Sequence, residues 1–130
     1  MSASTRSASR SQLVIASALV ADIALVLAFA AIGRASHDSD IFAGLWITAW
    51  PFLAGLAVGW IVTFAWRAPT APVRTGLGVW AATVIVGMLL RAASGQGIAP
   101  AFIIVATLTL LVLLVGWRAV AALVTRVRSR

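Results

Sequence analysis

The stretch QLVIASALVADIALVLAFAAIG, residues 12–33, decides the fold class because it holds one charged side chain, Asp22, within a long apolar run. About 20 helical residues cross the hydrocarbon core of a bilayer, so this stretch is long enough to span one. Ala28-Phe29-Ala30 fits a signal-peptide cleavage pattern, but the length of the run and the aspartate within it favour a retained helix.

Three further apolar runs of similar length follow the first, at about 41–66, 75–93 and 99–120. Each of them is long enough to form a membrane-spanning helix. The sequence therefore predicts an all-α integral membrane bundle of four transmembrane helices, forming a single domain over residues 12–120.

The composition supports this class and excludes several others. The chain has 130 residues, of which 62% are hydrophobic and 10% are charged, and a soluble domain of this size could not bury so much apolar surface. The net charge of +7 comes from arginines that stand singly at the ends of apolar runs, so nucleic-acid binding is not expected. With no cysteine and one histidine, we expect no metal site and no cofactor.

The arginines predict the orientation, because cytoplasmic segments carry an excess of basic residues. Arg34 and Arg91 fall on one side of the predicted membrane. The other arginines fall on the opposite side, at Arg6, Arg10, Arg67, Arg74, Arg118, Arg126, Arg128 and Arg130. Both termini are therefore predicted to be cytoplasmic, with residues 1–11 as an unstructured Ser-rich tail and 121–130 as a basic tail. Residues 67–74 contain two prolines and are expected to form an extended connector.

Three polar residues within the apolar runs are candidates for function. Asp22 lies about ten residues into the first run, which predicts a position near the membrane midplane, facing the bundle interior and either paired or protonated. A structural role in holding helices in register and a functional role as an ion site are both open for it. Arg91 and Thr83 share one face of the third helix with small residues, which indicates packing inside the bundle. Snorkelling to the membrane surface is the alternative for Arg91.

The second predicted helix carries a packing signal. Gly55 and Gly59 form a small-xxx-small pair that permits close approach of another helix, and Gly87 belongs to the small face of the third helix. Pro51 lacks a backbone donor and frees the carbonyl of Ile47, which predicts a kink in the second helix.

The loop between the first two helices is the most polar internal stretch of the chain. Arg34, His37, Asp38 and Asp40 are predicted to form an external polar mouth, together with Arg91 from the outer end of the third helix. Helix capping is the favoured explanation for the acidic residues of the loop, since aspartates suit the N-terminus of a helix.

The sequence resembles a small membrane-protein family catalogued as domain of unknown function three-zero-five-four, from about residue 12 to 120. The similarity rests on Asp22, Gly33-Arg34-x-Ser36-His37, Trp50-Pro51-Phe52-x-x-Gly55, Gly87-Met88-x-x-Arg91 and Gly116-Trp117-Arg118. The resemblance implies a four-helix protein of the bacterial inner membrane, from actinobacteria or haloarchaea. It implies no substrate and no functional residues, because the family has none assigned.

Two functions follow from these features. The first is a non-enzymatic membrane protein, acting in the bilayer as a homo-oligomer or as an accessory to another membrane protein. The alternative is a small-solute or ion transporter that uses Asp22, because small multidrug-resistance transporters also combine four short helices with one acidic residue in the first. No nucleophile paired with a base is visible, so an enzyme is not expected.

Overall fold

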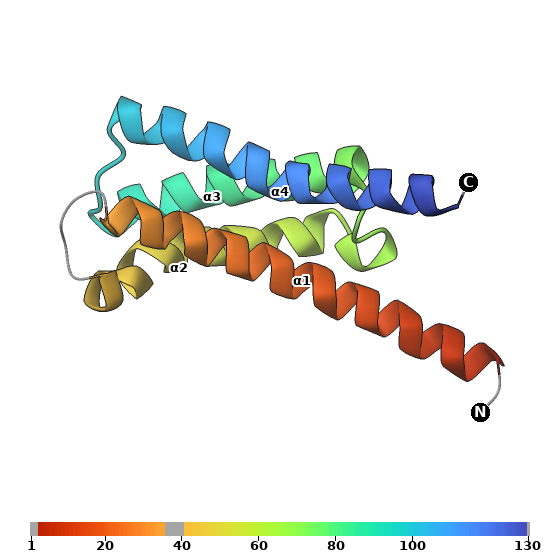
Figure 1. Ribbon diagram of the computed structural model, residues 1–130. Helices are drawn as coiled ribbons and strands as arrows, with labels where there is room; N and C mark the ends of the chain where they lie inside the picture. Colours follow the sequence, from red (N-terminus) through yellow and green to blue (C-terminus); the bar gives the residue numbers. More distant parts are fainter. Residues whose placement is uncertain (1–2, 36–40, 130) are drawn as a thin grey trace.

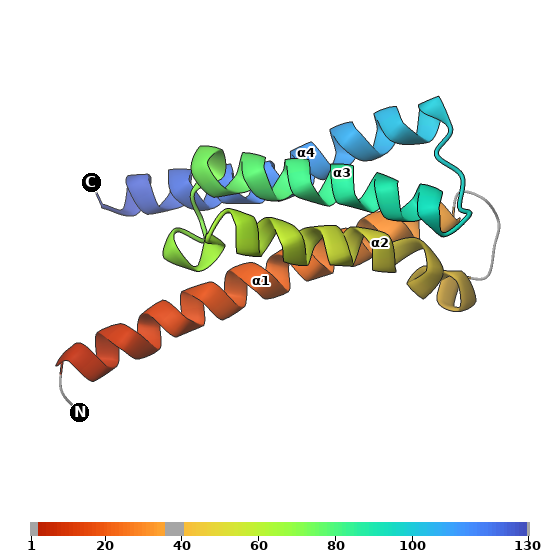
Figure 2. The same ribbon diagram turned by 180° about the vertical axis from the view of Figure 1, so that it is seen from behind.

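The computed structural model describes residues 3–35 and 41–129. Its four long helices form an up-and-down bundle: α1 (Ala3–Ala35), α2 (Ile41–Val62), α3 (Gly78–Ala93) and α4 (Pro100–Arg128) (Figures 1 and 2). Each of the four is long and apolar enough to cross a membrane. For α3 this includes the six residues before it. The prediction of an all-α bundle is confirmed, and the described ranges contain no strand.

The two outer helices extend further than the sequence indicated. Residues 3–11, expected to be an unstructured tail, are part of α1, and residues 121–128 are part of α4. The prediction of an unstructured N-terminal tail is therefore wrong over residues 3–11. Once an apolar span holds a helix, each added residue gains a hydrogen bond without a new nucleation cost, and alanine and arginine favour the helix. Both termini lie at the same end of the bundle, where the first half of α1 diverges from α4 (Figures 1 and 2).

The connection between α2 and α3 folds back on itself and is not extended throughout. Phe64 adopts a left-handed backbone with φ 51° and ψ 52° soon after the end of α2. A short 3₁₀ turn, η1 (Ala65–Arg67), follows, and a π-helical segment, η2 (Pro72–Leu77), continues directly into α3. The expected extended connector is therefore wrong from Pro72 onward, because proline suits the first turn of a helix, where its missing N–H costs nothing.

The helices α2 and α3 make the most extensive contact in the bundle, and glycines bring them together. A Cβ added to Gly55 would lie 2.8 Å from the backbone oxygen of Thr83, and one added to Gly59 would lie 3.0 Å from the Cα of Val79. Contacts this close to backbone atoms leave no room for a side chain. The two helices therefore pack backbone against backbone along this face.

An aromatic cluster joins three helices towards the end of the bundle opposite the termini. Phe29 of α1, Phe52 of α2 and Phe102 of α4 have ring centroids 5.4–6.3 Å apart, a favourable range for aromatic pairs. A Cβ added to Gly87 of α3 would lie 2.5 Å from the Phe52 ring, so this glycine makes room for it. All four helices therefore contribute to this part of the core.

Candidate functional site: a buried ion pair between the first and fourth helices

Asp22 lies on the face of α1 that packs into the bundle. Ala18, Asp22, Val26 and Phe29 recur every three or four residues, and all of them are buried, Asp22 completely. A carboxylate facing lipid at this position would cost several kcal/mol. The apolar residues of the stripe therefore carry Asp22 into the interior, where it meets side chains of α2 and α4.

Four N–H groups surround the Asp22 carboxylate. Arg118 of α4 binds it through two parallel contacts, Nη1 to Oδ1 at 2.9 Å and Nη2 to Oδ2 at 2.6 Å. Trp60 of α2 donates from Nε1 to Oδ2 at 2.8 Å, and Trp117 of α4 donates from Nε1 to Oδ1 at 2.9 Å. Each carboxylate oxygen thus accepts two hydrogen bonds. The guanidinium and the two indoles can only donate hydrogen bonds, and the carboxylate oxygens accept all four of them.

Arg118 is also completely buried, and two more of its N–H groups donate to backbone oxygens. Its Nε donates to the Pro69 carbonyl at 2.8 Å, and its Nη1 donates to the Leu114 carbonyl at 2.9 Å. The guanidinium carbon also lies 4.8 Å from the centre of the Trp117 ring, within the range of a cation–π contact. One side chain therefore joins α1, α4 and the α2–α3 connection.

The sequence accommodates this arginine through a glycine of η2. A Cβ added to Gly76 would lie 3.2 Å from the Cδ of Arg118, so the absence of a side chain leaves room for the arginine stem. Thr75 holds the connection closed, because its hydroxyl donates to the Ala68 carbonyl at 2.6 Å. The Pro69 carbonyl is thus held in a fixed position as an acceptor for Arg118.

The ion pair lies nearer the end of the bundle that carries the termini than its centre. Trp60 is two residues from the end of α2, and the Pro69 carbonyl belongs to the connection beyond it. The predicted midplane position of Asp22 stays a prediction. Because α1 already begins at Ala3, the start of the helix does not mark the membrane surface.

Arg91, the second charged candidate, lies at the opposite end of the bundle from Asp22 and turns towards the α3–α4 loop. Its Nε and Nη2 donate to the Gly97 carbonyl at 3.1 and 2.7 Å, and its Nη1 donates to Gln96 Oε1 at 2.8 Å. Its guanidinium carbon also lies 4.3 Å from the centre of the Phe102 ring. Arg91 therefore orders a loop and does not share a site with Asp22.

Thr83 and the loop candidates do not extend the ion-pair site either. Thr83 is completely buried, and its hydroxyl donates to the Val79 carbonyl of its own helix at 2.7 Å. The side chain of Arg34, together with His37 and Asp38, lies outside the described part of the chain. The external polar mouth therefore stays a prediction.

Sequence reasoning missed four residues that complete these contacts. Arg118 was assigned to the cytoplasmic side, and neither Trp117 nor Trp60 was given a role in a site. Gln96 was also overlooked, although its side-chain nitrogen donates at 3.0 Å to the carbonyl of Ile47. Pro51 leaves that carbonyl without its helical partner, and the first turns of α2 bend away from the rest of the helix (Figures 1 and 2).

Among the described residues, no group of three or more histidine, cysteine, aspartate or glutamate side chains is placed to hold a metal ion. The hydrogen-bonding capacity of Asp22 is taken up by tryptophan and arginine. The arrangement is therefore an internal ion pair that holds α1, α4 and the α2–α3 connection together at one point.

Comparison with known proteins identifies the family. The chain matches the model of a family described as "Protein of unknown function (DUF3054)" over residues 19–121. No curated protein and no solved structure matches it. The match corrects the resemblance drawn from individual motifs in two respects: the shared region begins at residue 19 instead of about 12, and the match gives no support for a source in actinobacteria or haloarchaea. Because the matched region covers most of the sequence, the chain belongs to the DUF3054 family, whose function is unknown.

Proposed function

We propose that this multi-pass membrane protein is a non-enzymatic component of the bacterial cytoplasmic membrane, acting within an assembly of its own copies or with another membrane protein. The observation that carries the proposal is the state of Asp22. Its carboxylate accepts four hydrogen bonds from α2 and α4, so the most conspicuous intramembrane charge holds the bundle together.

The alternative, a transporter that uses Asp22, requires the carboxylate to exchange these partners for a proton or a cation. Leaving Arg118 buried without its counter-ion costs about 3–5 kcal/mol, which is a large part of the net stability of a small domain. Asp22 and Arg118 are both completely buried. These features favour a structural pair over a carrier site.

The hydroxyl groups in and beside the spans also support a non-enzymatic role. Thr63, Thr83 and Thr125 each donate to the carbonyl four residues earlier in the chain, at 2.7–2.9 Å. Threonines engaged in this way are committed to their own backbone. None of the three is paired with a base that would activate it as a nucleophile.

The test of this proposal compares association with flux. The full chain is extracted in a mild detergent, and its mass is measured by light scattering and native mass spectrometry. A defined complex, with more than one copy or with a second membrane protein, is the expected result. In parallel, purified chain in liposomes is tested for proton flux with a pH-sensitive dye. A flux above that of empty liposomes, lost in Asp22→Asn but kept in Thr125→Ala, would overturn the proposal.

The proposed orientation, with both termini in the cytoplasm, is tested by cysteine labelling. The chain has no cysteine, so single substitutions give a clean background. We expect Ser39→Cys to react with a membrane-impermeant maleimide in intact cells and Thr70→Cys to react only after the cells are opened. The reverse pattern would contradict the orientation derived from the arginines.

A further inference from the structure

A hollow lies where α1 diverges from the bundle, between this helix and the α2–α3 connection. On α1 it is lined by Arg10, Ser11, Val14 and Ile15. On the other side it is lined by Trp66, Arg67 and Pro69. Ser11, Ile15, Ala18 and Asp22 lie on one face of α1, and Ala18 is the first buried residue along the helix. The hollow therefore opens directly above the residues that lead to the ion pair.

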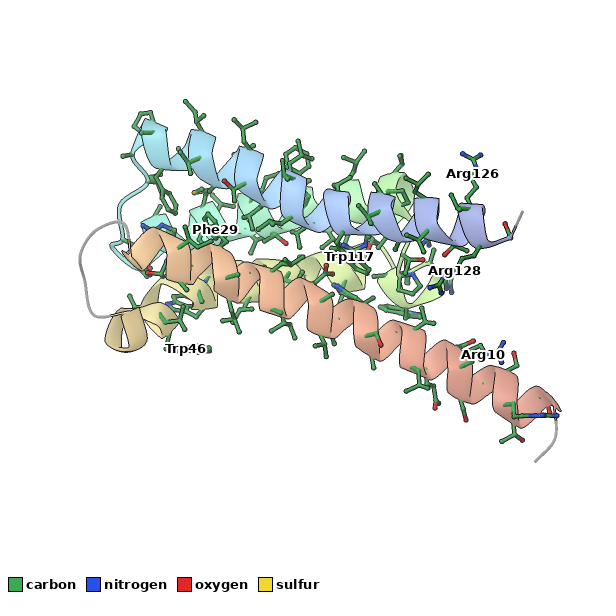
Figure 3. The ribbon with its side chains drawn as sticks, in the orientation of Figure 1. Arg10, Phe29, Trp46, Trp117, Arg126 and Arg128 are labelled. Carbon is green, nitrogen blue, oxygen red and sulfur yellow. The ribbon has the colours of Figure 1, made fainter. Side chains whose placement is uncertain are left out.

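The hollow carries positive charge that the described residues do not neutralise. Asp22 is the one acidic residue within ranges 3–35 and 41–129, and Arg118 already pairs with it. Arg10 and Arg67 therefore have no carboxylate partner there. Figure 3 shows Arg10 extending from the side of α1 that faces the end of α4, whereas Arg126 points away from this space. The two guanidinium groups of the hollow are available to an anionic ligand.

The backbone beside the hollow is held in an unfavourable conformation. Phe64 is the one non-glycine residue with a positive φ in the described chain, and a left-handed backbone is rare for a bulky residue. Its ring packs edge-on against Trp66, with centroids 5.4 Å apart, and lies 4.9 Å from the guanidinium carbon of Arg67. These contacts fix an aromatic ring and a positive charge side by side at the rim.

The lining changes from charged to apolar with depth, which identifies the kind of ligand. Arg10 stands two residues before the apolar run of residues 12–33, and Arg67 directly follows the run of residues 41–66, so both lie at the polar ends of these runs. Val14 and Ile15 lie about one turn further along α1, and they line the hollow together with Trp66. Arginines bind phosphate through directed hydrogen bonds, and an apolar wall suits an acyl chain. A free anion such as inorganic phosphate would contact only the arginines of the hollow and leave its apolar wall uncovered.

We propose that this hollow binds one anionic phospholipid, with its phosphate between Arg10 and Arg67 and an acyl chain along Val14, Ile15 and Trp66. The lipid occupies the space that the divergence of α1 leaves open. It lies next to Pro69, whose carbonyl accepts the hydrogen bond from Arg118. The predicted cytoplasmic position of this end of the bundle agrees with the proposal, because the inner leaflet carries anionic lipid.

The test uses the full chain in a neutral detergent, supplied with equal amounts of dioleoyl phosphatidylglycerol and dioleoyl phosphatidylcholine. Native mass spectrometry counts the lipids that stay bound. We expect one phosphatidylglycerol to be retained in preference to phosphatidylcholine. Arg10→Gln and Arg67→Gln should each weaken its binding about five-fold, the effect of one basic residue at a membrane surface.

Arg126→Gln is the matched control, because it removes the same charge from a side chain directed away from the hollow. Arg10→Lys and Arg67→Lys keep the charge and should bind within about two-fold of the wild type. If Arg126→Gln and Arg10→Gln weaken the binding of phosphatidylglycerol equally, the effect depends only on the net charge of the protein, and the proposal is overturned. Equal retention of the two lipids would also overturn it, as would displacement of phosphatidylglycerol by millimolar inorganic phosphate.

Discussion

The contact between α2 and α3 and the contact between α1 and α4 are built on opposite principles. The inner pair is neighbouring in sequence and packs through Gly55 and Gly59, with backbones in direct contact. The outer pair shares much less contact and is joined by Asp22 and Arg118, 96 residues apart. In a membrane, lipid competes with every apolar helix surface, so helices associate through close packing or through polar groups. In this chain, close packing joins α2 to α3, and a polar contact joins α1 to α4.

The comparison is tested most severely by removing one charge of the ion pair. We expect a loss of about 3–5 kcal/mol in the free energy of unfolding for each of the variants Asp22→Leu, Asp22→Asn and Arg118→Met. The Asp22 variants leave the buried Arg118 without its counter-ion, and Arg118→Met leaves Asp22 without its own. The measurement is unfolding in mixed micelles, followed by circular dichroism as denaturing detergent is added.

The double variant Asp22→Leu/Arg118→Met provides the control for this experiment. The double variant should lose clearly less free energy of unfolding than the sum of the losses in Asp22→Leu and Arg118→Met, because neither charge then remains unpaired. If the losses add, the two residues act independently, and the polar tie between α1 and α4 is refuted.

The tryptophans sharpen the same contrast at a smaller scale. Trp60→Phe and Trp117→Phe each remove one hydrogen bond to a charged group and should cost about 1.5–3 kcal/mol. Trp80→Phe is the matched control, because Trp80 Nε1 donates at 2.9 Å to the neutral carbonyl of Thr107. Its loss should be about 0.5–1.5 kcal/mol in the same unfolding experiment. Equal losses in all three variants would show that the Asp22 charge adds nothing.

The glycine face is tested by adding a single methyl group. Gly55→Ala should lower the free energy of unfolding by about 1–3 kcal/mol, because its Cβ would meet the backbone of Thr83, which cannot move aside easily. Gly55→Leu should be worse. Gly116→Ala is the control, since a Cβ there has no neighbour within 4 Å. If Gly55→Ala unfolds like the wild type, α2 and α3 are further apart than described.

The smallest expected effect concerns the bend of α2, where the hairpin itself depends on a polar contact. Gln96→Ala should cost about 0.5–1.5 kcal/mol, because the Ile47 carbonyl loses its donor. In a Pro51→Ala background, the N–H of residue 51 restores that hydrogen bond, and Gln96→Ala should become nearly neutral. Thermal denaturation of the four proteins measures the coupling. Equal costs in both backgrounds would show that Gln96 does not compensate for the proline.

The helices themselves could be predicted from the sequence, because each apolar run is long enough to span a bilayer and is bounded by polar or proline-containing segments. The spacing of Gly55 and Gly59 also indicated a close-packed face, although spacing within one helix does not say which helix packs against it. The helical state of residues 3–11 could not be predicted from their Ser-rich composition, because it depends on propagation from the stable span that follows.

The partner of Asp22 was beyond sequence reasoning for a different physical reason. Ten arginines are present, and those at helix ends satisfy the charge distribution expected of a membrane protein equally well. Only the packing of α1 against α4 places Arg118 and not Arg126 beside the carboxylate. One signal was present, since Arg118 falls inside the fourth apolar run, where an arginine needs a partner.

The separation of 96 residues between Asp22 and Arg118 has a consequence for the synthesis of the chain. Translation proceeds from the N-terminus at roughly 5–20 residues per second, so α1 emerges about 5–20 seconds before the arginine that neutralises it. During that interval the nascent protein carries an aspartate without its counter-ion. A chain truncated before α4 lacks Arg118, so its Asp22 keeps no counter-ion from that helix. The fourth helix is thus the one that completes the ion pair.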